Sequence, residues 1–102
     1  MIVEDTYAVR RVVKKYVETE GYAVLEAEDG VAAVAAVSNN HVDLILLDVM
    51  LPKLDGFNVL KILKADPRYR RIHVILCTAK NQREDVILAK KLGANTYIVK
   101  PF

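Results

Sequence analysis

Leu44-Ile45-Leu46-Leu47-Asp48 is an uninterrupted aliphatic run that ends on a carboxylate. Parallel strands that are buried on both faces have such continuous aliphatic runs, and open α/β folds bind ligands just beyond the carboxyl ends of these strands. The run therefore predicts a central parallel strand with Asp48 at its functional end. Taken alone, a carboxylate in this place is more often a solvated strand-end residue than a catalytic one, so the rest of the chain has to decide between the two.

Strand-like and helix-like segments alternate on both sides of this run. Apolar residues recur at helical spacing in four segments, each followed by glycine, asparagine or proline: 9–17, 31–37, 59–63 and 86–92. Short aliphatic runs predict strands at 2–3, 23–25, 44–47, 72–77 and 97–99. Strands that alternate with helices form a parallel sheet with right-handed crossovers and helices on both faces. We therefore expect a doubly wound α/β fold with the flavodoxin-like strand order 2-1-3-4-5.

Composition limits the class of protein. The 102 residues are 53% hydrophobic, which fits a single domain over residues 1–102. Fifteen basic residues against thirteen acidic ones, a net charge of +2, give no support for nucleic-acid binding. No apolar stretch is long enough to span a membrane, and the single cysteine, Cys77, is expected to be a core thiol in a reducing compartment. We expect a soluble, cytoplasmic protein.

Three acids are expected to meet at one edge of the sheet. Glu4 and Asp5 follow the first strand, Asp48 ends the third, and the predicted strand order makes these strands neighbours. Carboxylates held close together repel, so one of them takes up a proton unless a cation neutralises them. Oxygen ligands without Cys or His favour Mg²⁺ over zinc. A second interpretation stays open for Glu4 and Asp5, which could instead cap the helix that begins after Thr6.

Thr78 and Lys100 end the fourth and fifth predicted strands at the same edge. Lys100 offers a point charge to a phosphoryl oxygen, and the Thr78 hydroxyl and the backbone N–H of Ala79 offer hydrogen bonds. Each residue alone more often caps a loop or reaches solvent. Together with the acids, these residues indicate phosphate chemistry.

Four motifs in this order resemble the receiver domain of two-component response regulators: Ile2-Val3-Glu4-Asp5, residues 46–52 with Asp55-Gly56-Phe57, Thr78-Ala79, and residues 93–102. The resemblance covers nearly the whole chain. It implies that Asp48 is the phosphoacceptor and that Asp5 and Asp48 bind Mg²⁺ directly. It also implies that Glu4 acts mainly through metal-bound water and that Met50 offers its backbone carbonyl.

The same resemblance implies a switch. Asp48 takes a phosphoryl group from a histidine kinase or phosphotransfer protein, and Lys100, Thr78 and the Ala79 amide stabilise its charge. Tyr97 then swings inward and changes the surface of the fourth helix and fifth strand, which a downstream effector reads. A cis Lys100-Pro101 bond is implied as well. Slow hydrolysis of its own phosphoaspartate makes the chain a self-modifying switch rather than a conventional enzyme.

Two other functions stay open. A Mg²⁺-dependent phosphohydrolase with an aspartyl nucleophile has cleft chemistry of the same kind, but it needs a second Asp where Met50 stands, and a cap domain. A flavin-binding or structural flavodoxin-like module would not need Lys100 or the acidic pair. His41 and His73 do not look like phosphodonors, and the basic run 68–71 is expected to be a solvated surface.

The last residues raise a further expectation. Receiver domains continue past Pro101-Phe102 into a fifth helix that covers one sheet face, so we expect either truncation after the fifth strand or coverage by another segment or copy. Exposed apolar patches usually mark interfaces. We therefore expect a tendency to form homodimers through this face.

Overall fold

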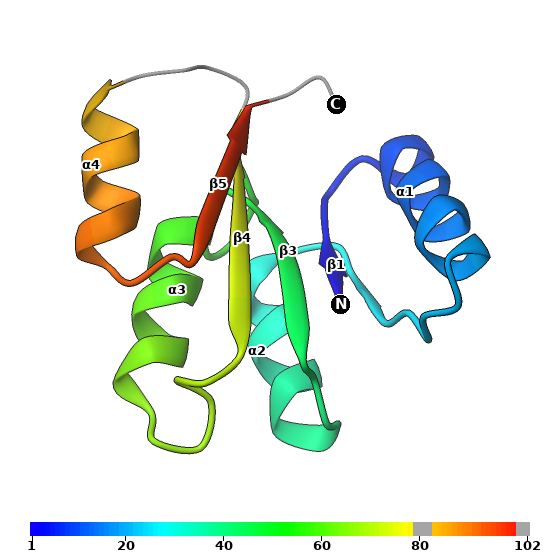
Figure 1. Cartoon of the computed structure of the whole chain (residues 1–102), viewed down its shortest axis with the longest axis horizontal. Helices are drawn as coiled ribbons and strands as arrows, with labels where there is room; N and C mark the ends of the chain where they lie inside the picture. The colour runs from blue at the N-terminus through cyan, green and yellow to red at the C-terminus, as the bar shows by residue number, and fades with distance from the viewer. Residues whose placement is uncertain (79–82, 100–102) are drawn as a thin grey trace.

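The structure, a computed structural model, describes residues 1–78 and 83–99 (Figure 1). Its elements are β1 (Ile2–Val3), α1 (Tyr7–Thr19), β2 (Glu26–Ala27), α2 (Gly30–Asn39), β3 (Leu44–Asp48), α3 (Gly56–Ala65), β4 (His73–Thr78), α4 (Arg83–Lys91) and β5 (Thr96–Val99). Within these residues, no helix is long and apolar enough to cross a membrane.

All neighbouring strands of the sheet are parallel, in the order β2-β1-β3-β4-β5. The predicted fold class and strand order are confirmed. β3 is central, and its pairing with β4 runs from Leu44 opposite His73 to Asp48 opposite Cys77. The aliphatic run at 44–47 therefore forms the middle of the sheet, as its composition indicated.

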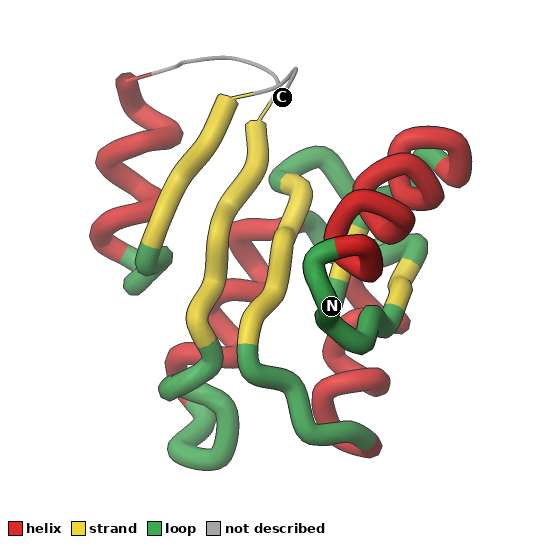
Figure 2. The backbone as a smooth tube through the Cα atoms, turned by 45° about the vertical axis from the view of Figure 1, so that its right-hand side comes forward, coloured by secondary structure: helices red, strands yellow, loops and turns green. Residues whose placement is uncertain are grey.

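Helices lie on both faces of the sheet. Figures 1 and 2 show α2, α3 and α4 on one face and α1 on the other. The core lies on the first face, where alternate residues of β3 and β4 are fully buried with two leucines of α3; these residues are Ile45, Leu47, Val74, Leu76, Leu60 and Leu63. α1 contributes no fully buried residue. The face that carries α1 is thus the less covered one among the described residues.

Glycines follow two of the helices, as predicted. Gly21 after α1 and Gly93 after α4 both have φ of +94°, a conformation that favours glycine. Asp29 and Asp55 are the N-caps of α2 and α3. Their side chains accept hydrogen bonds from the amides of Ala32 at 2.7 Å and Asn58 at 2.9 Å, respectively. These local signals explain why the helix positions agree with the periodicity.

The predicted strand at 23–25 is wrong. β2 is Glu26–Ala27, and it pairs with β1 through Ile2 opposite Glu26. Leu25 lies just before the strand and is 37% exposed, although its carbonyl accepts a hydrogen bond from the Ile2 amide. The apolar pattern misplaced the strand because Glu26, a residue type that is depleted in strands, is stabilised there by ion pairs with α1.

Candidate metal centre

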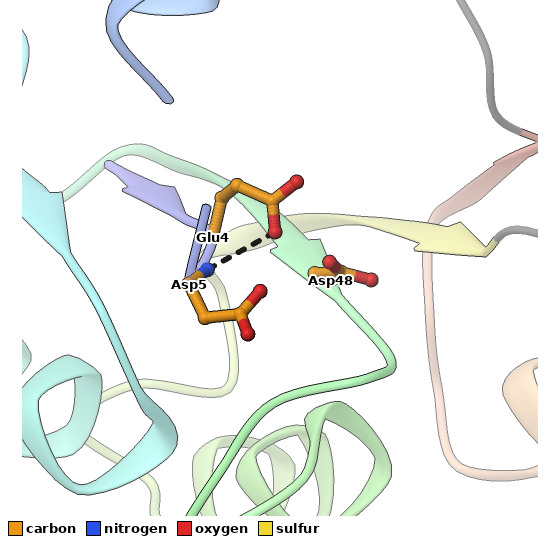
Figure 3. A group of neighbouring side chains, drawn as sticks. All are labelled: Glu4, Asp5 and Asp48. Carbon is orange, nitrogen blue, oxygen red and sulfur yellow. Dashed lines mark hydrogen bonds between the residues drawn. The ribbon is translucent and has the colours of Figure 1, made fainter. Parts of the chain in front are cut away.

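Three carboxylates meet at the carboxyl edge of the sheet (Figure 3). One oxygen from each of Glu4, Asp5 and Asp48 lies within 4.8 Å of the others. Glu4 and Asp48 are each only 6% exposed, whereas Asp5 is exposed to solvent. The cluster therefore has a buried side formed by two acids and an open side next to Asp5.

Strand register places these residues together. β1 pairs with β3 through Ile2 opposite Leu46 and Val3 opposite Leu47. Glu4 and Asp48 are the next residues along each strand, so a continued register sets them at the same level. The amide of Glu4 also donates to the carbonyl of Ala27 at 3.1 Å, which extends the pairing with β2 by one residue.

Local hydrogen bonds orient two of the carboxylates. The amide of Asp5 donates to Oε2 of Glu4 at 3.0 Å, and the amide of Met50 donates to Oδ1 of Asp48 at 3.2 Å. The N-cap of α1 is Thr6, whose side chain makes no capping hydrogen bond, and the carboxylate of Glu4 is bonded to an amide that precedes the helix. These contacts favour the interpretation of Glu4 and Asp5 as cluster residues over the capping pair.

Gly56 shapes the backbone behind Asp48, a role that the sequence motif did not reveal. A Cβ on Gly56 would overlap the carbonyl oxygen of Asp48 and lie 2.8 Å from the Cα of Val49. The amide of Gly56 donates to the carbonyl of Val49 at 3.0 Å, and the amide of Val49 donates to the carbonyl of Cys77 at 2.9 Å. The first turn of α3 is thereby fixed against the strand end that carries Asp48.

The donor set suits a hard divalent cation. All the candidate ligands of the cluster are carboxylate oxygens, with no Cys or His in the group. Mg²⁺ prefers such oxygens, usually takes one or two protein carboxylates and keeps several waters. Three acids at this spacing also repel one another in the absence of a counter-charge. The residues present therefore fit a bound Mg²⁺ ion.

The other predicted site residues are only partly described. Thr78 ends β4, is 4% exposed and pairs with Val99 of β5. It directly follows Cys77, the residue of β4 that pairs with Asp48. Tyr97 lies in β5 and is half-buried. The Met50 side chain is 71% exposed. Ala79, Lys100 and the Lys100-Pro101 bond fall outside the described residues.

The class of domain to which this site belongs follows from the match of the chain to a known family. The sequence model of the family described as "Response regulator receiver domain" matches residues 1–102. The chain belongs to the response regulator receiver family. A receiver domain acts as a phosphoacceptor switch in two-component signal transduction, which agrees with an acidic cluster at the end of a parallel sheet.

Curated relatives of this receiver domain include both free-standing and larger proteins. It is 36% identical over 104 residues to the chemotaxis protein CheY1 of Helicobacter pylori, covering 100% of this chain and 84% of the relative. It is 40% identical over 102 residues to the DNA-binding dual master transcriptional regulator RpaA of Synechocystis, covering 100% of this chain but 42% of that protein. The receiver domain thus spans less than half the length of such transcriptional regulators.

Solved structures agree in fold. The chemotaxis protein CheY4 of Vibrio cholerae superposes with a TM-score of 0.93 at 30% identity, covering 99% of this chain and 84% of that one. The Mn²⁺-bound form of response regulator Rcp1 superposes with a TM-score of 0.90 at 34% identity, covering 98% of this chain and 78% of that one. At least one structural neighbour of this receiver domain therefore binds a divalent cation.

Proposed function

We propose that Asp48 takes a phosphoryl group from a histidine kinase or phosphotransfer protein in a reaction that requires Mg²⁺. The convergence of Glu4, Asp5 and Asp48 within 4.8 Å supports this assignment most strongly. Asp48 is the member of the cluster that ends the central strand, and the Met50 amide holds one of its oxygens. A carboxylate oriented in this way loses little side-chain freedom when it reacts with phosphorus.

In the proposed transfer, an oxygen of Asp48 attacks the phosphorus of a phosphohistidine. A P–O bond to the carboxylate forms as the P–N bond to the donor breaks, which leaves an acyl phosphate on Asp48 and a histidine on the donor. Mg²⁺ held by Asp5, Asp48 and the Met50 carbonyl, with Glu4 acting through water, would supply positive charge opposite the phosphoryl oxygens. Later attack by water on the same phosphorus restores Asp48 and releases phosphate.

Residues at the ends of the neighbouring strands complete the proposed site. The hydroxyl of Thr78 and the amide of Ala79 would donate hydrogen bonds to phosphoryl oxygens, and Lys100 would add a positive charge. Thr78 supports this role by its position, since it is buried at the end of the strand that pairs with β3. We propose that Tyr97 and α4 carry the change to an effector protein or domain, and that the domain works in the cytoplasm.

Intact-mass spectrometry tests the proposal. The chain is incubated with a small phosphodonor and Mg²⁺, and it should gain the mass of one phosphoryl group, which a chelator added beforehand prevents. Asp48→Asn should gain none. Asp43→Asn is the matched control, because Asp43 is an exposed acid just before the start of the same strand, and it should be phosphorylated like the wild type.

Two results would contradict the assignment. Phosphoryl uptake by Asp48→Asn would place the acceptor elsewhere. Repeated turnover of small phosphate esters without a stable phosphorylated form would instead indicate the phosphohydrolase alternative.

A further inference from the structure

Arg10 bridges two strand ends from the first turns of α1. Its Nε donates to Oε1 of Glu26 at 3.1 Å, and its Nη1 donates to the backbone carbonyl of Glu4 at 2.7 Å. The Arg10 side chain is only 11% exposed. A guanidinium that is held at two of its nitrogens in a mostly buried setting has one defined orientation.

Glu26 is the anchor of this bridge. Its Oε2 accepts from Nζ of Lys14 at 3.0 Å and lies 3.8 Å from Nη1 of Arg11. Glu26 is in β2, so the ion pairs join α1 to the edge of the sheet. The carboxylate that holds Arg10 is thus itself fixed by a second close cation.

The peptide group between Glu4 and Asp5 is bonded at both of its polar atoms. Its carbonyl oxygen accepts from Arg10 at 2.7 Å, and its N–H donates to Oε2 of Glu4 at 3.0 Å. A peptide group is planar, so a rotation of this one would break both bonds and turn the amide that lies between the Glu4 and Asp5 side chains away from the Glu4 carboxylate. Those side chains are two of the three carboxylates in the cluster. The orientation of this one plane therefore sets the position of the Glu4 carboxylate within the cluster.

We propose that Arg10 is a positioning residue for the metal site, because it fixes the Glu4–Asp5 peptide plane and thereby sets the affinity for a divalent cation. This inference rests on the proposed function. Arginine is required for the role, since the bridge needs two N–H donors held at a fixed angle, and lysine has a single ammonium head. Groups that orient metal ligands commonly change metal affinity about tenfold to 100-fold when they are removed.

Arg11 provides a matched control in the same helix. Both guanidinium groups approach the ring of Tyr7, at 5.5 Å for Arg10 and 6.0 Å for Arg11, and both contact Glu26. The Arg11 side chain, however, is 52% exposed. Of the two, Arg10 is the residue with a hydrogen bond to the Glu4 carbonyl. Loss of Arg11 removes the same charge and the same aromatic contact while leaving the peptide plane held.

Mg²⁺ titration by isothermal calorimetry, followed by phosphoryl uptake at a series of Mg²⁺ concentrations, tests the role. Arg10→Met should raise the Kd for Mg²⁺ about tenfold or more, and Arg11→Met should leave it within about twofold of the wild type. Uptake by Arg10→Met should need more Mg²⁺ for half-saturation yet approach the wild-type maximum at saturation. Arg10→Lys should resemble Arg10→Met, because it cannot make both bonds.

A merely structural role for Arg10 predicts a different pattern. It would lower the melting temperature and leave the Mg²⁺ Kd of the folded protein unchanged, which would overturn the inference. If Arg10→Met does not fold, Glu26→Gln keeps Arg10 and weakens its anchor, and an unchanged Mg²⁺ Kd in that variant would overturn the inference as well. Failure of the wild type itself to bind Mg²⁺ would instead contradict the proposed function on which the inference rests.

Discussion

The Cα of Gly56 packs directly against the backbone of Asp48, so that no side chain fits between the first turn of α3 and the end of β3. The contact joins a helix N-terminus to the strand end that carries the proposed phosphoacceptor. Protein interiors are packed densely, and a forced shift in one element is passed to its neighbour. The position of Asp48 is consequently coupled to the size of residue 56.

Gly56→Ala should both destabilise the fold and impair the site. The added methyl group would overlap the Asp48 carbonyl oxygen, and overpacking of this kind costs about 1–3 kcal/mol of unfolding free energy. The displaced strand end should also weaken Mg²⁺ binding. Urea denaturation gives the first effect and calorimetric titration gives the second.

Gly21→Ala is the control for this substitution. A Cβ on Gly21 meets nothing within 4 Å, but its φ of +94° disfavours alanine by about 1–2 kcal/mol. We expect it to lose stability while keeping the wild-type Kd for Mg²⁺. Equal Mg²⁺ affinity in both glycine variants would show that the Gly56 contact does not position Asp48.

Mg²⁺ should stabilise the wild-type fold and not the Asp5→Asn variant. Asp5 is the exposed member of the cluster, so its substitution removes a ligand without opening a cavity. At about 100 times its Kd, a ligand of the native state adds about 2.7 kcal/mol to the unfolding free energy. Thermal unfolding with and without Mg²⁺ measures this difference. A Mg²⁺-dependent gain of the same size in Asp5→Asn would remove Asp5 from the proposed ligand set.

The ion pairs of Glu26 should make stability depend on pH in the acid range. The hydrogen bond from Lys14, and after it the one from Arg10, lowers the pKa of Glu26 below its ordinary value of 4.5, against an opposing effect of burial. The unfolded chain therefore binds this proton more readily than the folded one. The stabilisation is complete above pH 4.5 and is lost as the pH falls through the folded-state pKa.

The comparison of wild type with Glu26→Gln at several pH values isolates this effect. The difference in melting temperature should be largest near neutral pH and should vanish in acid, where the wild-type carboxyl is protonated. A difference that stays constant down to strong acid would show that the ion pairs do not cause it.

Lys64→Met should destabilise the end of α3 and the start of β5. Nζ of Lys64 donates to the carbonyls of Arg70 at 3.0 Å and Ile72 at 2.9 Å and to Oδ1 of Asn95 at 3.3 Å. Hydrogen bonds of charged groups contribute about 1.5–3 kcal/mol, so we expect a loss of that order in urea denaturation. Lys61→Met, on an exposed position of the same helix, should change little. Equal effects of the two substitutions would contradict a specific role for Lys64.

Tyr97→Ala should separate phosphoryl uptake from its structural effect. Tyr97 is half-buried in β5, away from the acidic cluster in sequence, and we propose that it transmits the signal. Intact mass should show normal phosphorylation, whereas the change in hydrogen exchange of α4 and β5 on phosphorylation should disappear. Tyr16→Ala, at a 69% exposed position on α1, should retain that change. Loss of uptake in Tyr97→Ala would contradict the assignment.

Most of the fold was predictable because its signals are local. Continuous aliphatic runs indicated buried parallel strands, and residues such as Gly21 and Gly93 indicated where helices end. The predicted strand order placed Glu4, Asp5 and Asp48 at one edge of the sheet, and the structure confirms their proximity.

The missed features depend on contacts between distant segments. β2 begins at Glu26 because Arg10 and Lys14 stabilise an acid there, which no apolar pattern reveals. The hydrogen bond from Arg10 to the Glu4 carbonyl could be anticipated only weakly from the sequence. Its one indication is a cluster of basic residues in the helix that starts next to Glu4 and Asp5. The close contact of Gly56 with Asp48 likewise requires the packing of α3 to be known.

The pairing of β1 with β3 distinguishes a part of the chain where the residue register is fixed from a part that tolerates inserted residues. The register of Ile2 with Leu46 and of Val3 with Leu47, continued by one residue, sets Glu4 level with Asp48. Asn40 is exposed and lies between α2 and the start of β3, at the end of the strand opposite to Asp48. Extra residues inserted there would leave the carboxylates in place. A one-residue slip of β1 would instead turn Glu4 to the other face of the sheet. A reporter peptide or a dye-labelled loop is therefore best introduced at Asn40.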